Sequence, residues 1–273
     1  MSKAERDCAV CGQFYPADTL ELKNSVDELI GNVPPQKIDR IRGIIAPHAG
    51  YMYSGSTAAH AYALLRGRKY STVVIVSPSH REYFDGVSVF PGNSYRTPLG
   101  SVNIDIRLRD RLLNASSVIT SSNAGHKEEH AIEVQLPFLQ SVLDEFVFLP
   151  VVVGDQCRGN CFALGEALAI ILQGENALLV ASTDLSHYHS SAIADQLDAV
   201  IIEDVNKFDY EGLMRDIELK RGEACGGGPA VAVMLALSRL GARTMRVLHH
   251  CNSGDISGDH SQVVGYLSAV AHE

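Results

Sequence analysis

The sequence contains no tryptophan and only 8 phenylalanines among its 273 residues. An aromatic platform that stacks nucleic-acid bases is therefore not expected. Basic residues are also in deficit, because 23 Lys and Arg stand against 32 Asp and Glu, which gives a formal net charge of −9. This balance argues against a nucleic-acid groove and against a polybasic membrane patch. We expect neither nucleic acid nor a membrane as a partner.

Long apolar segments are missing as well. Residues 1–7 contain no apolar stretch of the kind found in secretory signals. The longest apolar runs, around 146–153 and 230–237, are far shorter than the roughly 20 residues that cross a bilayer. These absences predict a cytoplasmic protein. Because thiols stay reduced in the cytoplasm, we expect the 6 cysteines to be free, metal-bound or reactive, and not paired in disulfides.

Short apolar runs alternate with helical patterns along the chain. Asp18 and Glu21 form a capping pattern before an apolar stripe that ends at Gly31, which predicts a helix. A further helical pattern over 129–143 is expected to break at Pro137. The remaining predicted helices are 54–65, 162–172, 192–207 and 229–240, and the predicted strands are 43–46, 72–76, 146–153, 177–181, 244–249 and 263–270, with a hairpin of 86–90 and 95–105 around the turn 91–94. This order predicts a single α/β domain over residues 1–273, with a mostly parallel central sheet flanked by helices on both faces.

Polar residues follow three of the predicted buried strands at the point where each strand ends. His48 follows the first, His80 the second, and Asp184 and His187 the third. The carboxyl ends of parallel strands share one edge of a sheet, and ligands bind at that edge. We therefore expect these four side chains to converge.

Cys225 is a candidate fourth member of this group, because it precedes three glycines and a predicted helix. A thiolate near a helix N-terminus is favoured by the helix dipole. Two imidazoles and a thiolate form a set of three metal ligands that leaves coordination positions open, as catalytic metal sites do. His187 is then a candidate base near neutral pH, with Asp184 adjusting its environment.

Other His and Cys residues carry weaker signals. His126 and His130 are four residues apart, but they form no His-Glu-x-x-His motif, so we expect them at a pocket wall or behind the ligands. Glu133 fits a solvated helix position equally well. The Cys8-x-x-Cys11 spacing lacks the second pair of a zinc site and a preceding strand typical of a redox motif.

Several of these segments together resemble the Memo family, also described as the AmmeMemoRadiSam system protein B family. The resemblance runs in order from about residue 10 to the end of the chain. The matching stretches are 12–18 around Phe-Tyr-Pro, 46–55 (APHAGYMYSG), 77–80 (SPSH), 97–100 (TPLG), 129–139 (EHAIEVQLPFL), 182–188 (STDLSHY), 224–229 (ACGGGP) and 254–266.

The resemblance implies a fold similar to the LigB-type class III extradiol dioxygenases. It implies His48, His80 and Cys225 as metal ligands, with Cys225 standing where the dioxygenases have a carboxylate. His187 would match their catalytic base, and Asp184 would lie beside it. The metal would be iron or copper, with zinc as an alternative, and the chemistry would be redox or oxygenase-like. Residues taken as pocket or supporting residues are Tyr51, His126, Glu129 and His130.

Three functions stay open from the sequence. The first is a metal-dependent oxidoreductase or dioxygenase-like enzyme that acts on an unknown small molecule or peptide. The second is a non-enzymatic scaffold that binds a peptide or partner in the same cleft. The third is a hydrolase with Cys225 as nucleophile, His187 as base and Asp184 as orienting group. The resemblance also implies two protein partners, an AMMECR-domain protein and a radical SAM protein.

Overall fold

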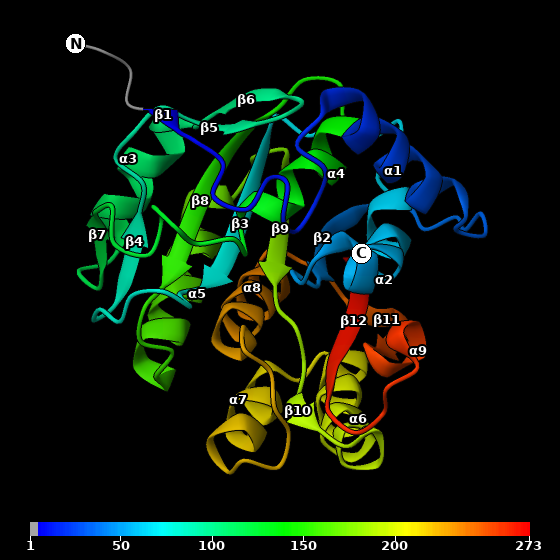
Figure 1. Cartoon of the computed structure of the whole chain (residues 1–273). Helices are drawn as coiled ribbons and strands as arrows, with labels where there is room; N and C mark the ends of the chain where they lie inside the picture. Colours follow the sequence, from blue (N-terminus) through cyan, green and yellow to red (C-terminus); the bar gives the residue numbers. More distant parts are fainter. Residues whose placement is uncertain (1–4) are drawn as a thin grey trace.

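The computed structural model describes residues 5–273 and is built around a nine-stranded sheet (Figure 1). The strand order is β10-β12-β2-β9-β3-β8-β4-β7, and β11 pairs with β12. The four central strands β2, β9, β3 and β8 are parallel, whereas β12 and β4 flank them in antiparallel orientation. The strands are β2 (Ile41–Ala46), β3 (Thr72–Pro78), β4 (Val87–Val89), β7 (Ile119–Ser121), β8 (Val147–Val153), β9 (Ala177–Ser182), β10 (His187–His189), β11 (Thr244–Asn252) and β12 (Val263–His272).

Helices cover both faces of this sheet, which confirms the predicted fold class. The alternation of side chains along β3 shows why, since Val73 and Ile75 enter one core while Val74 and Val76 enter the other. Helices α1 (Thr19–Gly31), α2 (Tyr51–Ala63) and α4 (Leu136–Val142) pack on the first face. The second face is covered by α3 (Ile106–Ala115), α5 (Arg158–Leu172), α6 (Ser191–Lys207), α7 (Tyr210–Glu218) and α8 (Gly227–Arg239), and the short α9 (Gly254–Ser257) follows β11.

The predicted helix after Asp18 is confirmed. The Asp18 carboxylate accepts hydrogen bonds from the backbone N–H groups of Leu20, at 2.9 Å, and Glu21, at 3.0 Å. These bonds satisfy two of the donors that a helix N-terminus leaves unpaired. The stripe of α1 is buried as expected, with Leu22 and Val26 fully inside the core.

The predicted hairpin around 91–94 is wrong. β4 joins the large sheet beside β8, because its two valines are buried there. The hairpin instead joins β5 (Ser94–Thr97) to β6 (Gly100–Asn103), and β1 (Glu5–Arg6) pairs with β5 to complete a small three-stranded sheet. Residues 106–115, which carried no helix prediction, form α3, because Asp105 caps it through a 2.9 Å hydrogen bond from Leu108 N.

The predicted helix over 129–143 is only partly correct. Helical structure begins with a 3₁₀ turn at Glu133–Gln135 and continues as α4, which has Pro137 in its first turn. The Glu129 carboxylate accepts hydrogen bonds from the backbone of His130 and Ala131, both at 2.9 Å, so this stretch is a turn around a buried side chain. His126 and His130 therefore do not share a helix face.

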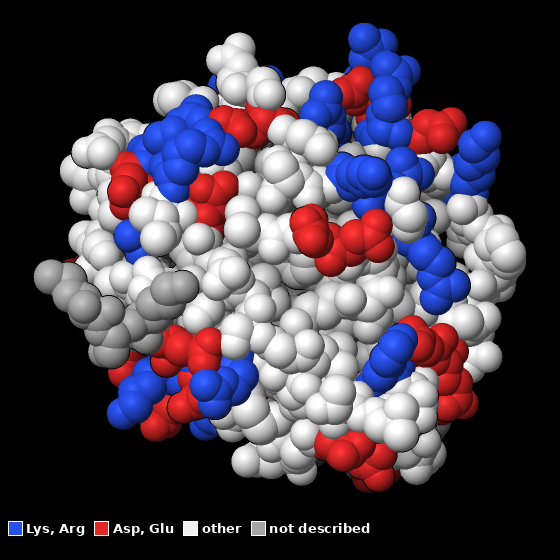
Figure 2. All heavy atoms as spheres, turned by 90° about the horizontal axis from the view of Figure 1, so that it is seen from above, with Lys and Arg blue, Asp and Glu red and all other residues white. Residues whose placement is uncertain are grey.

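Charges of both signs are mixed over the face of the molecule that Figure 2 shows, without an extended area of one sign. This agrees with the charge balance of the sequence, in which acidic residues exceed basic ones only modestly. Among the helices of residues 5–273, none combines the length and the apolar character that a bilayer crossing requires.

Candidate metal centre

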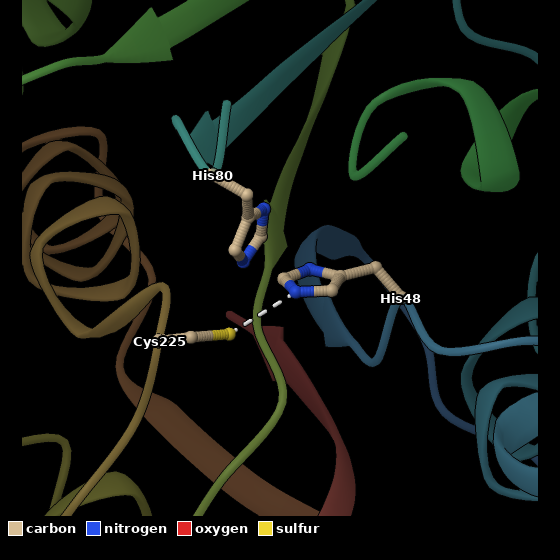
Figure 3. A group of neighbouring side chains, drawn as sticks. All are labelled: His48, His80 and Cys225. Atoms are coloured by element: carbon tan, nitrogen blue, oxygen red, sulfur yellow. Dashed lines mark hydrogen bonds between the residues drawn. The ribbon is translucent and has the colours of Figure 1, made fainter. Parts of the chain in front are cut away.

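The site lies where three neighbouring parallel strands end. β9 runs between β2 and β3, so the loops that follow these strands meet at one edge of the sheet. His48 comes from the loop after β2, His80 from the loop after β3, and Cys225 from the segment before α8 (Figure 3). The topology therefore brings together three residues that are up to 177 positions apart in the chain.

The three side chains present their ligand atoms to a common point. One such atom from each of His48, His80 and Cys225 lies within 4.8 Å of the others. His48 Nε2 is 3.1 Å from Cys225 Sγ, and the two imidazole rings have centroids 4.9 Å apart (Figure 3). His48 is almost fully buried, whereas His80 keeps 27% of its side chain exposed, so the site opens on the His80 side.

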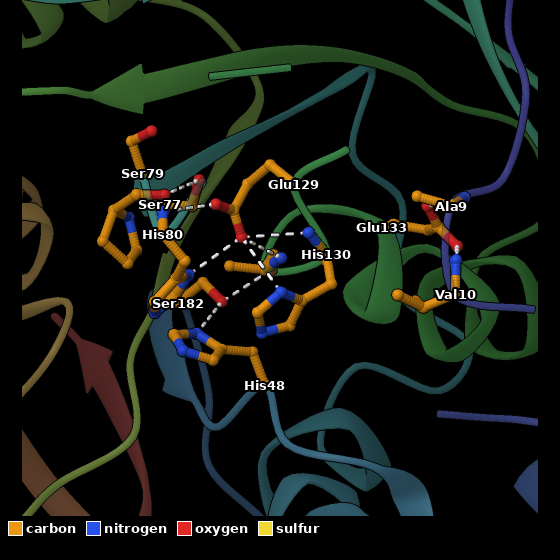
Figure 4. A network of polar contacts seen from close by, with 12 residues as sticks. Ala9, Val10, His48, Ser77, Ser79, His80, Glu129, His130, Glu133 and Ser182 are labelled. Atoms are coloured by element: carbon orange, nitrogen blue, oxygen red, sulfur yellow. Dashed lines mark hydrogen bonds and ion pairs between the residues drawn. The ribbon is translucent and has the colours of Figure 1, made fainter. Parts of the chain in front are cut away.

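The orientation of His48 follows from a chain of hydrogen bonds behind it. Ser182 Oγ donates to the carbonyl of Ala131 at 2.7 Å and accepts from Gln135 Nε2 at 2.8 Å. Its proton is thereby engaged, so Ser182 Oγ accepts from His48 Nδ1, which lies 3.0 Å away (Figure 4). His48 is thus held as the Nδ1–H tautomer, with the lone pair on Nε2.

His80 is held in the same tautomer by a carboxylate. Glu129 accepts from His80 Nδ1 at 2.9 Å and from the His80 backbone N–H at 2.6 Å (Figure 4). Burial opposes the ionisation of Glu129, but the hydrogen bonds that it accepts from His80 prevail and hold its pKa at about 2. An ionised carboxylate is only an acceptor, so His80 donates from Nδ1 and leaves its Nε2 lone pair free.

Burial sets the protonation of the other ligands. It lowers the pKa of His48 well below the ordinary histidine value, and the neighbouring His80 adds to this, so His48 is a neutral imidazole. Burial likewise raises the pKa of the Cys225 thiol, and the negative charge of Asp184 raises it further. A bound cation has the opposite effect, because it stabilises the thiolate.

Asp184 forms hydrogen bonds with both His48 and Cys225. Its Oδ1 accepts from the His48 backbone N–H at 2.7 Å, and its own N–H donates to Cys225 Sγ at 3.3 Å. Burial is the main cause that raises the pKa of this carboxyl group. His187 is half-buried beside it and donates from Nδ1 to the carbonyl of Leu185 at 2.8 Å, which leaves Nε2 as an acceptor. Within residues 5–273, Cys225 Sγ has His48 and Asp184 as its hydrogen-bond partners, and not His187.

His130 forms a wall of the same site. Its ring stacks on His80 with centroids 4.8 Å apart and meets His48 edge-on at 5.4 Å, while Phe14 packs on its other side at 4.8 Å. His130, Glu129 and His80 make a second group whose ligand atoms lie within 4.8 Å of one another. Glu129 Oε1 already accepts three hydrogen bonds in this group, so it is better suited to orienting His80 than to binding a metal.

Two residues predicted for the pocket lie elsewhere. His126 is buried in a separate network, where its ring nitrogens contact Ser88 Oγ and the Tyr95 hydroxyl. Tyr51 donates to the carbonyl of Val134 at 2.7 Å and packs on Phe138 in the core. Tyr51 belongs to one of the stretches that resemble the family, and a short motif alone does not say which of its residues face a ligand.

Sequence reasoning missed several supporting residues. Ser182 and Gln135 were not singled out, because their role depends on contacts that form only between distant elements. Glu133 is fully buried and pairs with Arg6, so the view of it as a solvated helix residue is wrong.

The expectation that no cysteines are paired in disulfides is also wrong, because Cys8 and Cys11 form a disulfide. The short strand β1 does precede this pair, although the sequence had indicated none.

A family model and the sequences of curated relatives agree on one family. The model of the family described as "Memo-like protein" matches residues 6–270. A MEMO1 family protein of Methanosarcina mazei is 37% identical, covering 97% of this chain and 98% of its own length. Another from Methanopyrus kandleri is 38% identical over the same shares. The crystal structure of an uncharacterized protein from Escherichia coli K12 superimposes with a TM-score of 0.54 at 13% identity, covering 85% of this chain and 99% of that one, which shows a shared fold.

Proposed function

This chain belongs to the Memo family, and we propose that its His48, His80 and Cys225 bind a transition metal for redox or oxygenase-like chemistry. The observation that carries the proposal is the tautomer of the two histidines. Each imidazole donates from Nδ1 to a fixed acceptor, Ser182 or Glu129, so that Nε2 is the nitrogen left for a metal. His48 Nε2 lies 3.1 Å from the Cys225 sulfur, and a ligand atom of His80 lies within 4.8 Å of both. Ordered partners behind both histidines are typical of metal ligands.

The donor set favours iron or copper, with zinc as the alternative. Two imidazoles and one thiolate are softer than the oxygen ligands that magnesium and calcium prefer. A redox-active metal bound here would supply one-electron chemistry and a position for an outside ligand, because three protein ligands leave its coordination incomplete. The exposed side of His80 is where such a ligand would enter.

Side chains of the protein itself would release and accept protons during this chemistry. The Cys225 thiol is protonated without a cation, so binding a metal releases this proton. Among residues 5–273, no hydrogen bond engages His187 Nε2, so this nitrogen is suited to taking a proton from a substrate. Asp184 holds the His48 backbone and contacts the Cys225 sulfur, so its role is to keep these two ligands in place.

The Cys–His hydrolase is less well supported. Its mechanism needs Cys225 activated by His187, whereas the sulfur hydrogen bonds with His48. Burial also raises the pKa of this thiol, which disfavours a metal-free thiolate nucleophile.

Metal analysis of the protein purified without added metal tests the proposal. We expect about one iron or copper ion per chain, because the three ligands form a single site. His48→Ala should abolish binding, because it removes one of three ligands. The matched control is His60→Ala, since His60 lies on α2 and stacks on His249 away from the cluster.

Substitution of cobalt(II) adds a readout specific to the sulfur ligand. The wild type should show a thiolate-to-metal charge-transfer band, and Cys225→Ser should lose it while His60→Ala keeps it. A wild-type protein that retains no metal after loading, or a His48→Ala variant that retains as much as the wild type, would refute the proposal. If such a metal-free cleft bound a peptide, the scaffold function would replace it.

A further inference from the structure

The loop between β1 and α1 contains a cysteine pair that the proposed metal chemistry does not use. Cys8 and Cys11 form a disulfide, with their Cα atoms 5.9 Å apart. Both residues are partly exposed. Cys157 and Cys161 are also close in sequence, but the structure leaves both as thiols.

Contacts outside the disulfide hold this loop in place. The buried Glu133 carboxylate accepts hydrogen bonds from the backbone N–H groups of Ala9, at 2.7 Å, and Val10, at 3.1 Å. Arg6 and Tyr15, on either side of the cysteines, also bond to Glu133. The two sulfur atoms would therefore stay near each other after reduction, which is what a reversible pair requires.

Cys8 lines a cavity with a volume of about 830 Å³. The cavity wall carries two cations, Arg81 and Lys127, that form no ion pair within residues 5–273. It also carries the carboxylates of Asp7 and Glu128. The volume suits a peptide-sized molecule, and the two signs of charge suit one that bears carboxylate and ammonium groups.

We propose that Cys8 and Cys11 are a redox-active pair that undergoes thiol–disulfide exchange with a small zwitterionic thiol bound in this cavity. The thiolate of the small molecule attacks Cys8 Sγ, the bond between the two cysteines breaks, and Cys11 leaves as a thiolate that takes a proton. The thiolate of a second molecule then attacks the sulfur of the first, the bond between that sulfur and Cys8 Sγ breaks, and Cys8 leaves as a thiolate that takes a proton. The products are the small-molecule disulfide and two protein thiols, so two thiols are oxidised while one disulfide is reduced.

This activity is independent of the proposed metal chemistry, although the two sites are adjacent. Arg81 follows His80 in the chain, and Glu128 precedes Glu129. The disulfide, the anchored loop and the cavity support this exchange, and none of them requires a bound metal.

Glutathione is the probe, because it is a small thiol with carboxylate and ammonium groups. The full chain is incubated with an excess of reduced glutathione and quenched with acid, the glutathione is removed by gel filtration in acid, and the protein thiols are titrated in denaturant. We expect four thiols before and six after exchange in the wild type. In Cys11→Ser, which cannot form the pair, the Cys8 thiolate should exchange with oxidised glutathione instead, so that mass spectrometry finds a glutathione adduct on Cys8 and one reduced glutathione is released. The matched control is Cys157→Ser, which removes an exposed thiol and should leave exchange unchanged.

The role of the cavity is tested by comparing glutathione with the uncharged thiol 2-mercaptoethanol. Each rate is divided by the rate of the same thiol with a small reference disulfide. We expect glutathione to be favoured roughly fivefold, since ion pairs with the exposed Arg81 and Lys127 contribute little each, and the double variant Arg81→Gln, Lys127→Gln to lose this preference.

Three results would overturn the proposal. A pair that glutathione opens only in denaturant is a structural disulfide. A pair that stays reduced in excess oxidised glutathione is not a redox couple. Exchange with no preference for glutathione in the wild type rejects the cavity as the binding site.

Discussion

Glu129→Gln should weaken metal binding although Glu129 is not one of the three proposed ligands. The carboxylate accepts from His80 Nδ1, from the His80 backbone and from the backbones of His130 and Ala131. A glutamine keeps the shape but has only one acceptor atom and adds an NH₂ group. In one orientation this NH₂ group faces the His80 backbone N–H, which then has no acceptor. In the other orientation it faces His80 Nδ1 and favours the Nε2–H tautomer of the ring, which cannot bind a metal through Nε2.

The magnitude follows from the loss of a partner that orients a ligand. Such changes typically reduce metal affinity by about 10- to 100-fold, or about 1.4–2.7 kcal/mol. The metal-free protein should also lose about 1–3 kcal/mol of unfolding free energy, because buried donors are left without an acceptor. The matched control is Glu128→Gln, since the neighbouring Glu128 is exposed.

Affinity is measured by competition with a chromophoric chelator, and stability by urea denaturation across pH. Glu129 has a pKa of about 2 in the folded state, below its ordinary value of 4.5, so it stabilises the fold above pH 4.5. This contribution is lost as the pH falls from about 4.5 to about 2. Glu129→Gln should therefore flatten this part of the stability curve. Equal metal affinity in the two glutamine variants would refute the reasoning.

Three further outcomes are expected. In the metal-free protein, iodoacetamide should modify exposed Cys157 before Cys225 at pH 8, because burial raises the pKa of the Cys225 thiol; peptide mapping that finds Cys225 modified first would contradict this. Gly226→Ala should reduce soluble yield and Tm, since an added Cβ would lie 2.2 Å from the Ser182 carbonyl, whereas Gly31→Ala meets nothing within 4 Å and should be tolerated. Asp18→Ala should cost about 1 kcal/mol of unfolding free energy through the lost helix cap and leave metal content unchanged; an altered metal content would show that α1 supports the site.

The order of apolar runs and turn signals determined the central architecture. The strands β2, β3, β8 and β9 were predicted from short apolar runs, since a strand buried on both faces has no polar positions. The polar residues at their ends then predicted that His48, His80 and Asp184 converge, because parallel strands end at one edge. The helical periodicity gave a wrong prediction at 129–132. The Glu129 carboxylate there accepts hydrogen bonds from the backbone N–H groups of His130 and Ala131, so the chain forms a turn in place of a helix.

The tertiary structure decided which of the remaining polar residues support the site. Ser182, Gln135 and Glu129 acquire their roles from hydrogen bonds between elements far apart in sequence, and no local pattern encodes such pairs. The same holds for Cys8 and Cys11, whose pairing depends on a loop anchored by Glu133, more than 120 residues away. The sequence by itself thus determined the four central strands of the sheet and the identity of the candidate ligands. Only the folded chain determined their tautomers, because a histidine's free nitrogen is set by what its other nitrogen touches.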